Sequence, residues 1–172
     1  MIDVQREYRQ IEAFYEEAEK MLAWPDERLF GKAPGVSGWS AAQHLEHLAK
    51  VNGRTFKGLR LLAEGKMPPV QGRVNLLGWL LLWMGRLPRG RAQAPAFSHP
   101  SADLSREELA RSLARNRQAM AALEPFLSLL PHLEGRMPHQ IFGMLDARQW
   151  LRFVRVHSAH HLRIIRDVAG RL

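Results

Sequence analysis

Apolar side chains recur every three or four positions along most of this 172-residue chain, and this spacing constrains its fold more than any other feature. Such a repeat places the apolar side chains on one face of an α-helix, which must then pack against another element. The pattern predicts four long helices and one short one, over residues 4–23, 40–65, 74–86, 105–125 and 146–170. The sequence contains no alternating strand pattern and no internal repeat. We therefore expect an all-α fold over residues 1–172, a single-domain four-helix bundle with an additional short helix.

Residues that cap or stop helices lie at the expected helix ends. Ser40, Ser105 and Asp146 each precede an apolar helical repeat and offer a side-chain oxygen to the free N–H groups of the first turn. Glu108, three residues after Ser105, completes a capping-box pattern. Pro25 stops the first helix. Segments rich in proline and glycine predict further loops, at residues 31–38, 66–69, 87–102 and 131–145.

Composition excludes several kinds of chemistry. The chain has no cysteine, which excludes disulfide bonds, thiolate metal ligands and cysteine nucleophiles, so any metal ion must be held by His, Asp or Glu. The net charge of +8 comes from 25 Lys and Arg against 17 Asp and Glu. Arginines are spread from Arg6 to Arg171, whereas proteins that bind nucleic acid usually gather basic residues on one surface with aromatic residues among them. We therefore expect a solvated, arginine-rich surface and no nucleic-acid partner.

The most apolar segment, Leu76–Met84, has nine residues, far fewer than the roughly 20 that a bilayer-spanning helix needs. Residues 1–7 mix acidic and basic side chains and lack the apolar run of a secretory signal. We therefore expect a cytoplasmic protein with no membrane partner. The segment itself is interpreted as a buried core helix or as the interface of a homodimer, because large exposed apolar patches generally mark interfaces.

Five of the eight histidines lie in two of the expected helices. His157 and His161 are four residues apart, so their rings lie one helical turn apart and are able to hold one metal ion. The same helix face carries the apolar residues Trp150, Phe153, Ile164 and Val168, which predicts that both rings point into the bundle. A third ligand would come from the second helix. On a helical wheel, His44 lies nearer the apolar stripe than His47, so geometry alone favours His44.

Two segments of the chain resemble signatures of the DinB-like superfamily. In the first, Trp39 is followed eight residues later by the pair His47-Leu48. The second begins before the last helix with a histidine and a Phe-Gly pair, at His139 and Phe142-Gly143. It continues on that helix with a tryptophan and a His-x-x-His-His triplet, at Trp150 and at His157, His160 and His161. The chain departs from the family pattern at Gln140, where proline is frequent, and at His44, where an apolar residue is usual. The resemblance implies a DinB/YfiT-like bundle.

The resemblance also implies a set of metal ligands, namely His47, His157 and His161. It therefore favours His47 where the helical wheel favours His44. The implied cofactor is a divalent metal ion, commonly zinc or nickel, and imidazole ligands suit both. Three further histidines are candidate accessory residues, at His44, His139 and His160. His139 and His160 would serve near the rim of the site as proton shuttles, or else as surface and loop-capping residues.

Relatives of this kind look like thiol-dependent transferases or isomerases, and others have been suggested to be metal-dependent hydrolases. The resemblance therefore implies a metal that activates a thiol or a water against a small-molecule substrate, with a low-molecular-weight thiol as the second partner. Glu46 is expected to face solvent and is not assigned as a general base. The alternative is a binding module without metal, in which the histidines hydrogen-bond each other and an apolar cleft or helix holds the partner. Both hypotheses stay open on the sequence alone.

Overall fold

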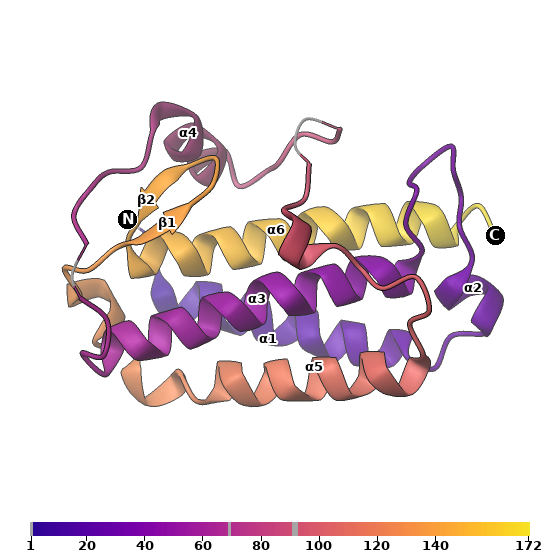
Figure 1. Ribbon diagram of the computed structural model, residues 1–172, viewed down its shortest axis with the longest axis horizontal. Coiled ribbons are helices and arrows are strands. Elements are labelled where there is room, and N and C mark those ends of the chain that lie inside the picture. Colours follow the sequence, from indigo (N-terminus) through magenta and orange to yellow (C-terminus); the bar gives the residue numbers. More distant parts are fainter. Residues whose placement is uncertain (1, 69, 91–92) are drawn as a thin grey trace.

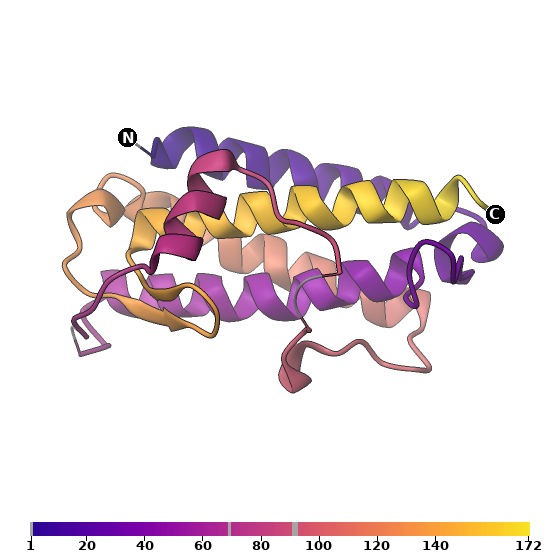
Figure 2. The same ribbon diagram turned by 90° about the horizontal axis from the view of Figure 1, so that it is seen from above.

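The computed structural model describes residues 2–68, 70–90 and 93–172. Pro69 of the expected loop 66–69 and residues 91–92 of the expected loop 87–102 therefore lie outside the described residues, as does Met1. Four long helices form a bundle, α1 (Val4–Met21), α3 (Ala41–Ala63), α5 (Arg106–Ala121) and α6 (Ala147–Ala169). They lie lengthwise beside one another in both views, with α1 and α3 each packed against α5 and α6 (Figures 1 and 2). The structure confirms the expected all-α fold and its four-helix bundle.

The predicted helix starts are confirmed. Ser40, Ser105 and Asp146 cap α3, α5 and α6, and each forms a reciprocal capping box with the residue three positions later. Each box satisfies two backbone N–H groups that would otherwise lack a partner. The starts of α3 and α6 are therefore fixed by local sequence, and these two helices carry the histidines discussed below.

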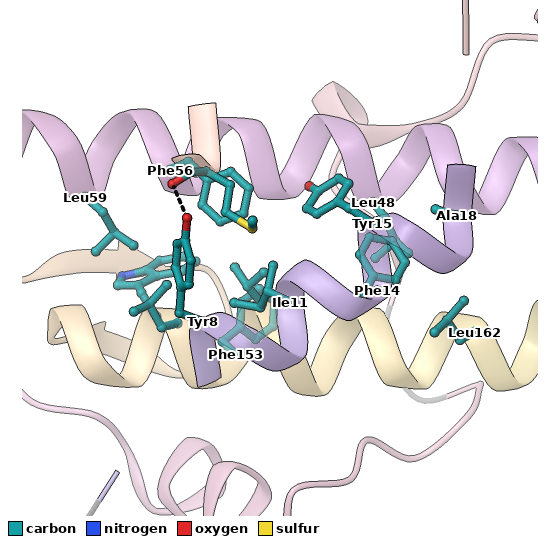
Figure 3. Close-up of a cluster of buried hydrophobic side chains, with 14 of the residues drawn as sticks. Tyr8, Ile11, Phe14, Tyr15, Ala18, Leu48, Phe56, Leu59, Phe153 and Leu162 are labelled. Atoms are coloured by element: carbon teal, nitrogen blue, oxygen red, sulfur yellow. Dashed lines mark hydrogen bonds between the residues drawn. The ribbon is translucent and has the colours of Figure 1, made fainter. Parts of the chain in front are cut away.

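The core lies between the long helices. Ile11, Tyr15 and Phe56 are fully buried, and each large buried side chain stabilises the fold by about 1.5–3 kcal/mol relative to exposure. Figure 3 shows labelled side chains of α1 among those of α3 and α6. The Tyr8 hydroxyl donates a hydrogen bond to the carbonyl of Met120 on α5 over 3.4 Å. Burial of the apolar stripe is what holds α1 against its neighbours.

The expectation that the chain has no strands is wrong for residues 131–145. There, β1 (Met137–His139) and β2 (Gly143–Leu145) form an antiparallel hairpin in which Met137 faces Leu145. Strands of three residues are too short to show alternation in a sequence. Gly143 has φ +80°, a left-handed conformation that glycine adopts without steric cost, and so allows the turn to close.

Within the described residues, two short α-helices lie outside the bundle (Figure 1). The helix α2 (Asp26–Phe30) was not predicted, because five residues after a proline show no helical repeat. The helix α4 (Leu76–Met84) was predicted, but the interpretation of it as a buried core helix is wrong. Only Gly78, Leu81 and Leu82 are buried, and the other six side chains are exposed. None of the helices in the described ranges combines the length and the apolar character that a bilayer-spanning segment needs.

Candidate metal centre

Three histidines from two helices meet inside the bundle. His47 comes from α3, and His157 and His161 come from α6. The Nε2 atom of His157 lies 3.4 Å from that of His47 and 3.1 Å from that of His161. One ligand atom from each of the three rings lies within 4.8 Å of the other two. Metal–nitrogen bonds of about 2.0–2.1 Å in a tetrahedral site space ligand nitrogens about 3.3 Å apart, so the spacing suits a zinc-sized ion.

The orientation of the His47 ring is set by a backbone carbonyl. Its Nδ1–H donates to the carbonyl of Ser98 over 2.9 Å, and Ser98 belongs to the short 3₁₀ helix η1 (Ala96–Ser98). Since Nδ1 carries the proton, Nε2 of the neutral ring keeps its lone pair and points toward the other two histidines. Metal-binding histidines characteristically donate their second N–H in this way.

His44 supports His161 from the side away from the cluster. The two Nδ1 atoms lie 2.9 Å apart, and Nε2 of His44 lies 2.9 Å from the Ser37 hydroxyl. The structure therefore brings His47 into the three-histidine cluster, whereas His44 contacts only the outer nitrogen of one member. The helical wheel favoured His44 because that ring lies nearer the apolar stripe, but both rings are buried to the same extent, with 3% exposure each, so burial does not identify the cluster member.

The third ring, His157, is oriented by packing. It stacks on Phe153 with ring centroids 5.1 Å apart and an interplanar angle of 14°. Its Nδ1 is buried and has no hydrogen-bond partner among the described residues. Phe153 therefore takes the orienting role that hydrogen bonds take for the other two rings.

Burial keeps these rings neutral. It lowers the pKa of His157 and of His161 well below the usual value, and neighbouring histidines add to the effect in both cases. Burial also lowers the pKa of His47. Neutral imidazole is the form that binds metal, so the rings do not have to lose protons before binding an ion at neutral pH. The donor set fits a divalent ion: three nitrogen lone pairs that converge, with no carboxylate among them.

The segment Ser98–Ser101, which begins at the His47 partner Ser98, is held against α3 by side chains of that helix. Glu46 accepts hydrogen bonds from the backbone N–H and the hydroxyl of Ser101, at 2.6 and 2.8 Å, and pairs with Lys50 at 2.9 Å. Lys50 in turn donates to the carbonyl of His99 over 2.7 Å. The expectation that Glu46 faces solvent is therefore wrong, since it is 7 % exposed and holds this segment.

The two remaining candidate histidines lie outside the cluster. His160 is buried, and its Nδ1–H donates to the carbonyl of Leu87 over 3.1 Å, so it is not on a rim. His139 accepts hydrogen bonds at Nδ1 from the backbone N–H groups of Ile141 and Phe142, both over 3.2 Å. This geometry agrees with the loop-capping interpretation of His139. Its ring is 4.5 Å from that of Phe153, whose ring stacks in turn on His157.

Three further residues complete the surroundings, and sequence reasoning assigned a role to none of them. The Trp39 ring lies 5.3 Å from that of His44 and 5.2 Å from that of His47. Trp39 was noted only as part of a motif. Ser37 reaches His44 from the segment before α3 and Ser98 reaches His47 from η1, and no local pattern predicts such contacts.

His44→Phe is expected to weaken zinc binding by about 10–100-fold, the usual effect of losing an outer partner of a metal-binding histidine. Phenylalanine fills the same space but leaves Nδ1 of His161 without a partner. The measurement is competition against a chelator of known affinity. His132→Phe, which removes a histidine of the short helix η3 (Leu130–His132), is the control and should bind zinc like the parent. Equal affinity in both variants would show that His44 does not support the site.

The comparisons with known proteins agree with this architecture. The sequence profile described as the DinB superfamily matches residues 10–165. A curated protein from Bacillus subtilis (strain 168), described as uncharacterized protein YuaE, is 24% identical over 163 residues, which cover 94% of this chain and 95% of that protein. No solved structure matches the chain. Because the superfamily profile extends over nearly the whole bundle, including all three histidines of the cluster, this chain belongs to the DinB superfamily.

Proposed function

We propose that this protein is a divalent-metal-dependent enzyme in which His47, His157 and His161 hold the ion. The observation that carries the proposal is the convergence of three neutral imidazoles, with Nε2 atoms 3.1 and 3.4 Å from that of His157. Zinc and nickel are the ions best suited to such ligands at this spacing. A site with three protein ligands leaves coordination positions open, as catalytic sites do and structural sites do not.

We infer a thiol-dependent transfer to an electrophilic small molecule as the reaction. A bound divalent ion would lower the pKa of a thiol or a water and so make it a nucleophile. Three neutral histidines leave the charge of the ion uncompensated, which favours an anionic partner such as a thiolate. Superfamily resemblance supports the same chemistry. The thiol partner, the cytoplasmic location and the homodimer stay predictions.

The chain itself contributes ligand orientation and exclusion of water. Ser98 and His44 fix two of the rings by hydrogen bonds, and Phe153 fixes the third by stacking. The Trp39 ring packs beside the rings of His44 and His47, and the carbonyl of Ser98 contacts His47. A site shielded in this way strengthens electrostatic interactions within it and slows competing reactions with water.

The test is the metal content of tag-free protein, measured by elemental mass spectrometry after incubation with zinc or nickel and removal of free ion. We expect about one ion per chain in the parent, by the stoichiometry of a three-ligand site. His47→Ala and His157→Ala should lose it, and His132→Ala should keep it. The loaded parent should then consume an aryl halide electrophile only when a thiol is added. A parent that takes up no ion would rule the proposal out.

The binding-module hypothesis is favoured by a different observation. The six exposed apolar side chains of α4 form a surface that the metal chemistry does not use. Protein without stoichiometric metal, but with a partner on α4, would support that hypothesis.

A further inference from the structure

The apolar face of α4 is the most unusual surface of the molecule. We define the α4 face by its six exposed side chains, at Leu76, Leu77, Trp79, Leu80, Trp83 and Met84. Their exposed fractions range from 39% for Leu80 to 79% for Leu76. They account for six of the ten large hydrophobic side chains that are exposed in the described part of the chain. Exposed apolar side chains gathered in this way mark a site of interaction.

The underside of α4 is fixed to the bundle, so its outer face stays outward. Gly78 lies against Phe142 so closely that an added Cβ would be 2.6 Å from the Phe142 Cβ. Arg152 of α6 donates from Nε to the carbonyl of Leu82 over 3.0 Å. Figures 1 and 2 show α4 projecting beyond the four long helices beside the hairpin. The α4 face is therefore a rigid, presented surface.

The segment of chain that contains α4 carries positive charges and no negative ones. Residues 65–102 contain no Asp or Glu, and their five cationic residues are Lys66, Arg73, Arg86, Arg89 and Arg91. Arg73 precedes α4 by three residues and Arg86 follows it by two, and both side chains are exposed. Arg89 pairs with Asp167 of α6 at 2.7 Å. An apolar helix is thus flanked by a cation at each end, in a segment without acidic residues.

We propose that the α4 face docks on an anionic phospholipid surface, with its apolar side chains at the boundary between headgroups and acyl chains. Helices that lie in this boundary combine Trp and Leu on one face with Lys or Arg that contact anionic headgroups. The rings of Trp79 and Trp83 are nearly parallel, with centroids 6.2 Å apart and an interplanar angle of 5°. Tryptophan is enriched at this depth of the bilayer.

A second copy of the chain is the less favoured occupant because of charge. A symmetric contact through α4 would bring Arg73 and Arg86 of both copies together, on chains that each carry a net charge of +8. An anionic membrane supplies the opposite charge instead. The expectation of no membrane partner came from the length of the segment. At about 1.5 Å per residue, α4 is too short to cross a bilayer, but length does not prevent a helix from lying at its surface.

The test is co-sedimentation with vesicles of phosphatidylcholine, alone and mixed with phosphatidylglycerol. We expect binding to the mixed vesicles, weakened by high salt. Leu76→Ser with Trp83→Ser should reduce the partition coefficient at least tenfold. The pair Arg73→Gln and Arg86→Gln should reduce it by roughly thirtyfold, at about fivefold per arginine near the surface. Leu129→Ser, which alters an exposed apolar residue away from α4, should bind like the parent.

Quenching of tryptophan fluorescence in the parent by brominated lipids provides a readout that needs no variant. Quenching in mixed vesicles supports insertion of the α4 face. The proposal would be overturned if the parent did not bind to mixed vesicles. It would also be overturned if Leu129→Ser lost as much binding as the variants of the α4 face. A different pair of results would assign the α4 face to a second copy of the chain. The parent would form a dimer in solution and bind no vesicles, and the double variant Leu76→Ser with Trp83→Ser would be a monomer.

Discussion

Glu7→Ala is expected to lower the free energy of unfolding by about 3–5 kcal/mol, because it removes one partner of a buried ion cluster. Glu7 of α1 is 2% exposed and accepts hydrogen bonds from Arg152 and Arg155 of α6, over 2.7 and 2.8 Å. Alanine would leave both guanidinium groups partly buried without an anion. For a chain of this length the melting temperature should fall by roughly 10 °C.

Glu17→Ala is the matched control, since it removes another glutamate of α1 that pairs with an arginine of α6. Glu17 contacts Arg166 over 2.7 Å, but the two side chains are 36% and 58% exposed. Solvent screens such pairs, and their loss costs about 0–1 kcal/mol. Urea denaturation of both variants measures the difference. Similar losses of unfolding free energy in the two variants would show that the Glu7 cluster stabilises the fold no more than a surface ion pair does.

The long helices were predictable because their signals are local. Ser40, Ser105 and Asp146 mark helix starts within four residues of sequence, and the apolar repeat continues for several turns. The hairpin at Met137–Leu145 was not predictable, because its strands are three residues long and depend on contacts with α4 and α6. Short elements take their conformation from tertiary packing more than from their own residues.

In the candidate site, too, the features set by local sequence were predictable and those set by tertiary contacts were not. The spacing of His157 and His161 on one stripe was enough to place both rings inside the bundle, since a helix fixes relative directions over one turn. Helix geometry alone favoured His44 over His47, because the choice depends on the relative rotation of α3 and α6, which no single helix contains. The Trp39 to His47 spacing of the family motif indicated His47, which is the residue in the cluster. The partners of these rings, Ser37 and Ser98, lie in the segments that connect the long helices. The path of the second segment is set by distant contacts such as that of Glu46 with Ser101.

Acid is expected to destabilise the metal-free protein strongly between pH 6.5 and pH 4. Burial lowers the pKa of His44 and that of His139 to about 4, against about 6.5 in the unfolded chain. Between these values the unfolded chain binds a proton at each ring and the folded chain does not, so stability rises with pH there and falls as pH is lowered. Each ring should cost about 2 kcal/mol at pH 5 relative to pH 7.

His139→Asn isolates one of these rings away from the three-histidine cluster. Protonation of His139 at Nδ1 would break both of its hydrogen bonds to the hairpin turn, whereas an asparagine oxygen accepts the same bonds without titrating. The variant should therefore lose less stability than the parent when pH falls from 7.5 to 5, by about 2 kcal/mol in urea denaturation with chelator present. Parallel pH profiles for variant and parent would mean that His139 takes up its proton without unfolding the turn. In that case the acid sensitivity would come from the buried histidines of α3 and α6.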